Sequence, residues 1–225
     1  MAPYFYSEHD VVEFSTWDIL RNLLLAARWT VVLSLITFVG GGVVAFVLLI
    51  LRATRGSVIQ GFISLYVQVF QGTPLLMQLF LAYFGLSLLG IETNAWTAAT
   101  LALTLYCSAF LVEIWFGCVK SVPKGQWEAA QSLALNKMEQ LRHVILPQAS
   151  RLAVAPTVGF LVQAIKGTAL ASVIGFIELT KASSMISNAT FKPFVVYTLV
   201  AICYFCICFP VSYCAKTLEG KLHAR

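Results

Sequence analysis

Two ionisable side chains, Lys166 and Glu113, stand inside long apolar stretches of the sequence. Lys166 lies about fourteen residues, or roughly 21 Å of helix, beyond the start of its stretch, which is past the middle of a bilayer. An ammonium group is costly in lipid and by default marks a polar pathway, where it could meet a carboxylate. The alternative is that Lys166 snorkels to the outer surface.

Gln163 and Leu170 share a helical face with Lys166, at spacings of three and four residues. If Lys166 lines a cavity, these two residues are expected to shape the pocket around the rest of the ligand. Glu113 lies about eighteen residues into its own stretch, close to the opposite membrane surface. It is expected to form a structural or gating ion pair with the basic loop that follows, rather than a substrate contact.

A break interrupts another apolar stretch at Gln71, Gly72, Thr73 and Pro74. Proline has no backbone N–H, so the break frees backbone groups that something must satisfy. Unwound backbone at membrane depth often lines the substrate cavity of a transporter. These four residues are therefore candidate substrate contacts, with a simple packing kink as the alternative.

Residue types that could catalyse a reaction do not cluster in this sequence. His9, His143 and His223 are far apart and have polar neighbours, and the six cysteines lie in or at the ends of apolar stretches. We expect neither a metal site nor a catalytic site, because no nucleophile, base or ligand set is assembled. The Gly-rich loop that cradles nucleotide phosphates is also missing, so the chain is expected to bind no cofactor of its own.

The composition requires a lipid environment. Of the 225 residues, 59% are hydrophobic and 11% are charged, well below the charged fraction of ordinary soluble domains. Charge-free stretches long enough to cross a bilayer predict an all-α membrane protein of about five spans, forming one transmembrane domain over residues 1–225. The expected spans are 29–51, 59–89, 95–119, 152–177 and 193–215.

The charge distribution predicts the orientation. Basic residues follow the first span, fill the loop between the third and fourth spans, and follow the fifth. By the positive-inside rule these segments and the C-terminus are cytoplasmic, and the acidic N-terminus is outside. The net charge of +5 therefore sets topology and does not indicate nucleic acid. Residues 16–28 are amphipathic and predict an interfacial helix, and the acidic start of the chain is unlike a cleaved signal.

The loop of residues 121–150 is the one long polar segment. It predicts two short helices, the first begun by Pro123, the second capped by Asn136 with Glu139 and closed by Pro147. On the first helix Trp127, Ala130, Gln131 and Ala134 share a face by spacing. A face with two alanines permits close docking into a groove of another protein.

The loop resembles the EAA loop of membrane subunits from ATP-binding-cassette importers, through Glu128-Ala129-Ala130 and Ile145-Leu146-Pro147. Further motifs narrow the resemblance to the polar amino acid permease branch and cover nearly the whole chain. They are Phe70-Gln71-Gly72-Thr73-Pro74-Leu75-Leu76, Glu113-Ile114, Val122-Pro123-Lys124-Gly125-Gln126, Leu146-Pro147-Gln148, Lys166-Gly167-Thr168-Ala169-Leu170 and Val173-Ile174-Gly175.

The resemblance implies a multi-pass permease of the bacterial inner (plasma) membrane that imports polar amino acids by alternating access. It implies a second, like permease subunit in a homodimer or heterodimer, two cytoplasmic ATPases that hold ATP and Mg, and a soluble periplasmic or lipid-anchored amino acid binding protein. The coupling residues it implies are Trp127, Glu128, Ala129, Ala130, Leu133 and Ala134. Through them, ATPase closure would rock the spans.

The sequence departs from the family pattern at several positions. The family usually has Gly at Ala134, and Ala disfavours a left-handed backbone there by about 1 kcal/mol. It often has Arg at Gln71 and Phe116 and Asp at Gly167, so polar positions near the pathway are neutral here. This leaves open a partner subunit that couples ATP without holding substrate. A self-sufficient secondary transporter would want inverted repeats and more paired ionisable residues, which are not evident.

Overall fold

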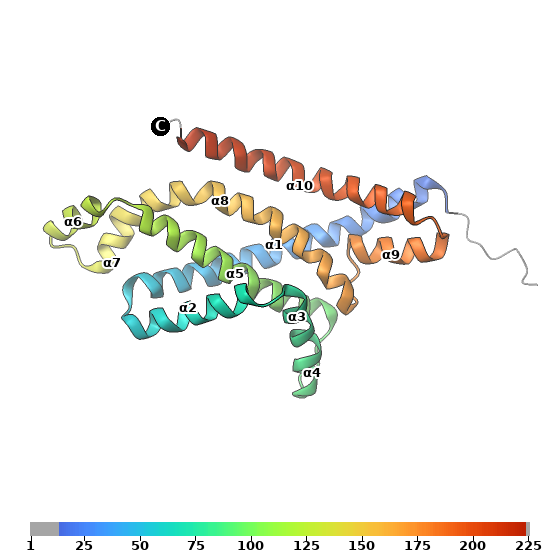
Figure 1. The fold of residues 1–225 in the computed structure, drawn as a ribbon, viewed down its shortest axis with the longest axis horizontal. Helices are drawn as coiled ribbons and strands as arrows, with labels where there is room; N and C mark the ends of the chain where they lie inside the picture. The colour runs from blue at the N-terminus through green and yellow to red at the C-terminus, as the bar shows by residue number, and fades with distance from the viewer. Residues whose placement is uncertain (1–13, 224–225) are drawn as a thin grey trace, which may run out of the picture.

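Four long helices form the body of the molecule in the computed structural model, which describes residues 14–223 (Figure 1). They are α1 (Thr16–Thr54), α5 (Ala95–Ser121), α8 (Leu146–Gly167) and α10 (Pro193–His223). All regular elements among the described residues are helical. The expected all-α membrane architecture is therefore confirmed. The acidic segment that includes Glu8, His9 and Asp10 lies outside the described residues.

Helix α1 runs without interruption for 39 residues. Its start is fixed by a capping box, in which the Ser15 hydroxyl accepts from the helix and the Asp18 carboxylate accepts from Ser15 N. Residues 16–28, expected as an interfacial helix that leads into the first span, form the first turns of α1 itself. No Gly or Pro interrupts this stretch, so nothing in the sequence ends the helix before the apolar run begins.

Helices α1 and α5 pack closely along their length (Figure 1). At Gly41 an added methyl group would lie 2.6 Å from Cβ of Cys107, closer than real atoms approach. Gly40 faces Thr104 of α5, 3.4 Å from the same kind of added group. The glycines of α1 therefore allow the close helix approach that small residues permit in membranes.

The expected second span is a sharply broken pair of helices. Helix α2 (Ser57–Gly72) ends at the predicted break, and α3 (Leu75–Phe80) leaves at an angle of 103°. A π-helical turn (Leu81–Gly85) then leads into the short α4 (Leu86–Leu88). Within residues 14–223, four helical segments are long and apolar enough to span a membrane, or five if this bent pair is counted as one span. Five spans were expected, and the bend is much larger than that of a tilted, kinked helix.

The polar loop forms α6 (Lys124–Ser132) and α7 (Lys137–Glu139) at one end of the molecule (Figure 1). The Asn136 capping box is confirmed, because Asn136 Oδ1 accepts from Met138 N and Glu139 N at 3.0 Å each. The predicted closure at Pro147 is wrong. A π-helical turn (Gln140–Ile145) joins α7 to α8, with Leu146 N donating to Leu141 O. This wider turn accommodates a proline that an α-helix interior would reject.

Helix α8 tightens into a 3₁₀ turn (Thr168–Ile174) and is followed by α9 (Leu179–Thr190), a helix that the sequence analysis did not predict. Helix α9 lies at the opposite end of the molecule from α6, beside the start of α1 and of α10 (Figure 1). Helix α10 packs along α8 and extends beyond the predicted end of the fifth span.

Candidate functional site

The break between α2 and α3 is stabilised by a side chain that the sequence analysis did not single out. Gln78 Nε2 donates to Phe70 O at 2.8 Å, to Thr73 O at 3.1 Å and to Thr73 Oγ1 at 2.9 Å. Thr73 and Pro74 are extended, so these carbonyls have left the helical pattern. Gln78 therefore satisfies the backbone groups that the proline frees. Its position four residues after Pro74 is the signal that could have found it.

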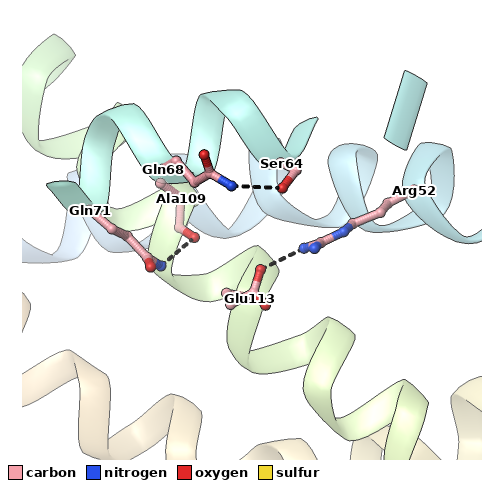
Figure 2. Close-up of polar contacts among 6 residues, drawn as sticks. All are labelled: Arg52, Ser64, Gln68, Gln71, Ala109 and Glu113. Carbon is pink, nitrogen blue, oxygen red and sulfur yellow. Dashed lines mark hydrogen bonds and ion pairs between the residues drawn. The ribbon is translucent and has the colours of Figure 1, made fainter. Parts of the chain in front are cut away.

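All four residues of the predicted break, from Gln71 to Pro74, are exposed in the single chain. Gln71 Nε2 donates to the carbonyl of Ala109 in α5 at 3.3 Å (Figure 2). A polar stripe precedes Gln71 along α2. It is formed by Gln60, Ser64 and Gln68 at helical spacing. In a membrane such a stripe needs water or protein in front of it.

Glu113 makes the predicted ion pair, but with a different partner. Its Oε2 lies 2.6 Å from Nη1 of Arg52, in the last turn of α1 (Figure 2). The expectation of a partner in the basic loop after α5 is wrong. The close packing of α1 on α5 places Arg52, rather than a residue of that loop, beside Glu113. The Arg52 guanidinium also lies 4.0 Å above the Phe116 ring, and Lys120 Nζ lies 4.6 Å from that ring. An Arg at position 116 would be a third cation here.

Lys166 and Gln163 line a groove of about 880 Å³ between α8 and α10. Phe209, Tyr213 and Glu219 of α10 form its other wall. Leu170 is on the 3₁₀ turn, outside this groove, although it is partly exposed. The described side chains provide no carboxylate within ion-pair distance of Lys166.

The structure does not bring Lys166 and the α2–α3 break into one cleft. The break borders a different, largely apolar cleft of about 310 Å³, which includes Thr73 and Gln78. The two regions do touch, because a methyl group added at Gly167 would lie 3.3 Å from Cδ2 of the Leu75 side chain. The Lys166 side chain lines the α8–α10 groove, so the two candidate regions open into different clefts of the single chain.

Helix α6 presents a different face from the one predicted. Ala130 is 2% exposed, so it is not available as a docking residue, and Trp127 is half-buried against the chain's own core. The predicted face is therefore wrong at Ala130, because α6 packs on the π-helical turn. The accessible residues are Glu128, Ala129, Leu133 and Ala134, with Leu133 74% exposed.

Ala134 adopts the left-handed backbone that the sequence analysis associated with this position, with φ of 56°. Leu135 N donates to Ala130 O at 3.4 Å and Ala134 N to Gln131 O at 2.9 Å. These two bonds form a Schellman motif, which ends the helix and normally has Gly at this position. The loop therefore holds its shape against a local backbone penalty.

Glu178 is a fully buried carboxylate that the sequence analysis did not single out. Its oxygens accept from Lys181 N at 2.8 Å, Thr180 N at 2.9 Å, Tyr204 Oη at 2.9 Å and Thr30 Oγ1 at 3.4 Å. It thus caps α9 and ties it to α1 and α10. Burial raises the pKa of Glu178, although its hydrogen-bond donors oppose that shift.

Residues 45–223 match the family model described as "Binding-protein-dependent transport system inner membrane component". The chain belongs to this family. Its members are transport components, and ATP hydrolysis belongs to a separate subunit. The family and the apolar helices together make this a multi-pass protein of the bacterial inner membrane.

Related permeases match over most of their length. The chain is 34% identical over 215 residues to the Bacillus subtilis (strain 168) protein named "Probable amino-acid ABC transporter permease protein YckA", covering 91% of this chain and 95% of that one. It is 32% identical over 214 residues to the "L-cystine transport system permease protein TcyB" of the same organism, covering 95% and 90%. The expected family resemblance is confirmed.

A solved structure shares the permease fold. The "Crystal structure of an amino acid ABC transporter with histidines" superposes with a TM-score of 0.85 at 28% identity, covering 92% of this chain and 99% of that chain. A MetNI methionine ABC transporter in an inward-facing conformation superposes with a TM-score of 0.69 at 20% identity, covering 87% and 96%, which shows the fold alone.

Proposed function

We propose that this chain is the transmembrane permease subunit of an ATP-driven importer of polar amino acids. The observation that carries the proposal is the full-length similarity to amino acid permeases, joined to an exposed coupling helix at one end of the bundle. The named substrates of similar proteins include L-cystine and glutamine, which are polar amino acids.

Movement of the ATPases is transmitted to the permease through α6. The chain has no phosphate-binding loop, so two cytoplasmic ATPases supply ATP hydrolysis, with ATP and Mg bound on them. Glu128, Ala129, Leu133 and Ala134 form the accessible surface that an ATPase groove would receive. Because α6 is linked through α7 and the π-helical turn directly to α8, movement of α6 displaces a spanning helix.

The orientation follows from charge. Basic residues surround α6 and the end of α1, which places this end in the cytoplasm and the start of α1 outside. The C-terminus is then cytoplasmic as well. A soluble periplasmic or lipid-anchored binding protein would deliver amino acids to the opposite end, where α9 lies.

The substrate path forms between two permease subunits. Three polar surfaces are available for it: the polar stripe of α2, the break at Gln71–Pro74 and the groove that Gln163 and Lys166 line. Leu170 lies on the 3₁₀ turn that follows α8, outside the groove. Lys166 supplies the ammonium that would hold the substrate carboxylate. Since these surfaces open into different clefts of one chain, completion of a single site requires the second subunit or a change in conformation.

A second candidate is a subunit that couples ATP but leaves substrate binding to an unlike partner. The Phe116 ring between Arg52 and Lys120 favours it, because similar permeases often have an arginine there. The hydrogen bond of Gln71 to Ala109 O also occupies a polar group of the break.

Transport by proteoliposomes that contain this chain, its permease partner, the ATPases and the binding protein tests the main proposal. We expect Glu128→Arg to reduce ATP-driven uptake at least about tenfold with unchanged amounts of permease, because a reversed charge disrupts the docked surface. Arg55→Glu, an exposed charge reversal outside α6 on the same side of the membrane, is the matched control. Uptake by this chain alone on an ion gradient would overturn the proposal.

Amino acid binding to the same complex separates the two candidates. Lys166→Ala is expected to weaken binding about tenfold or more, and Lys166→Arg to retain it in part. Unchanged binding with Lys166→Ala would favour the non-binding partner subunit.

A further inference from the structure

A small basic cavity lies where the last turns of α1 and α5 meet the start of α6. Its volume is about 300 Å³. Three cationic side chains from three helices line it: Arg52, Lys120 and Lys124. The remaining polar and aromatic lining comes from Gln60, Phe116 and Trp127, and no carboxylate is among the lining residues.

The positive charge of this cavity is only partly compensated. Glu113 pairs with Arg52, and this is the one ion pair among the side chains described from residue 14 to residue 220. Lys120 and Lys124 therefore have no carboxylate within 4.0 Å there. Arg52 and Lys120 also approach the same Phe116 ring, at 4.0 Å and 4.6 Å. Like charges held so close favour an anion between them.

The start of α6 adds to the positive electrostatic potential of the cavity. Pro123 occupies the N-cap position, and no side chain caps this nine-residue helix. The first N–H groups of α6 and the helix dipole therefore contribute a partial positive charge that favours an anion beside Lys124. A phosphate group matches both the lysines and the uncapped helix terminus.

We propose that this cavity binds the phosphate group of an anionic membrane lipid. The cavity lies at the ends of the apolar runs of α1 and α5, at the height of lipid headgroups. The apolar side chains of Ala53, Val119 and Val122 complete the lining of the cavity, so an apolar surface adjoins its basic groups. Basic cavities between helices at this depth suit such headgroups. The proposal rests on the proposed function only for the choice of the cytoplasmic leaflet.

Lipid retention by the assembled importer tests this site. The complex is purified in mild detergent, mixed with phosphatidylglycerol or with phosphatidylcholine of the same acyl chains, and examined by native mass spectrometry. We expect wild type to retain phosphatidylglycerol preferentially. Lys120→Gln/Lys124→Gln should weaken its retention about 30-fold, or roughly fivefold for each charge. Lys137→Gln/Arg142→Gln removes two exposed charges outside the cavity and should leave retention unchanged.

Three outcomes would overturn the proposal. The first is equal retention by the cavity variant and its control. The second is binding of inorganic phosphate at the same lysines with no retention of phosphatidylglycerol, which would make free phosphate the ligand. The third is that the permease subunits alone retain the lipid but the complete importer does not. This would mean that the lysines pair with acidic residues of the ATPase. Retention is measured without transport, so failure here is distinguishable from failure of the proposed function.

Discussion

The Arg52 guanidinium and the Glu113 carboxylate meet at 2.6 Å and join the last turn of α1 to α5. The Glu113 side chain is 46% exposed, whereas that of Arg52 is 12% exposed. Solvent therefore screens the pair, while the Phe116 ring holds Arg52 in place independently of Glu113. The pair is better suited to fixing the position of the α1 end than to stabilising the whole fold.

Glu113→Gln is expected to lower the free energy of unfolding by only about 0.5–1 kcal/mol, because an exposed carboxylate gains little from pairing. Thermal unfolding of the purified protein in detergent measures the change. Arg52→Gln should cost more, since it also removes the contact with Phe116. In the double variant the losses should be less than additive. Additive losses would mean that the two side chains do not interact.

Ala134→Gly is expected to stabilise the coupling loop by about 1 kcal/mol, because glycine adopts the left-handed backbone of Ala134 without the steric penalty of a Cβ. Ala129→Gly, an exposed change inside α6, should destabilise the same helix by about 1 kcal/mol. Hydrogen exchange of the α6 amides measures both. Slower exchange with glycine at 129, or faster exchange with glycine at 134, would contradict the Schellman geometry.

Gln78→Leu is expected to lower the free energy of unfolding by about 1–3 kcal/mol, because the carbonyls of Phe70 and Thr73 would lose their donor. Gln68→Leu is the control. Its amide is exposed and donates only to Ser64 Oγ at 3.3 Å, so the expected loss is below about 0.5 kcal/mol. Chemical denaturation in detergent distinguishes the two. Equal losses would show that Gln78 does not stabilise the break.

The sequence predicted the elements better than their directions. Pro74 marks where a backbone donor is missing, so the break at Gln71–Pro74 was predictable, but the 103° bend depends on how α3 packs against α5 and the 3₁₀ turn. Spacing likewise places Trp127 and Ala130 on one face of α6 without saying which way that face points. The structure packs α6 against the π-helical turn, which buries Ala130.

The candidate site was predicted in part for the same reason. Lys166 and Gln163 do share a groove, as their spacing indicates, yet its second wall is α10 and not the break. The sequence analysis missed Glu178 because a charge at the end of an apolar stretch is typical of a membrane boundary. Its partners Thr30 and Tyr204 are far away in the sequence, so only the tertiary structure reveals that the carboxylate is buried.

Glu178 is expected to make the stability of the fold depend on pH. Burial raises its pKa above the ordinary value of 4.5, so the folded state binds its proton more tightly than the unfolded state does. The corresponding stability is fully present below pH 4.5 and is lost as the pH rises through the folded pKa. Glu178→Gln cannot ionise and should lack this component.

The melting temperature measured from about pH 5 to about pH 8 tests this expectation, because the other carboxyl groups contribute equally to wild type and variant and cancel in the difference. The wild-type protein should lose more stability than Glu178→Gln as the pH rises. Tyr204→Phe should steepen the wild-type dependence, since it removes the hydroxyl that donates to Oε2 at 2.9 Å and supports the charged form. A wild-type profile parallel to that of Glu178→Gln would mean that the four donors fully offset the cost of burying the carboxylate.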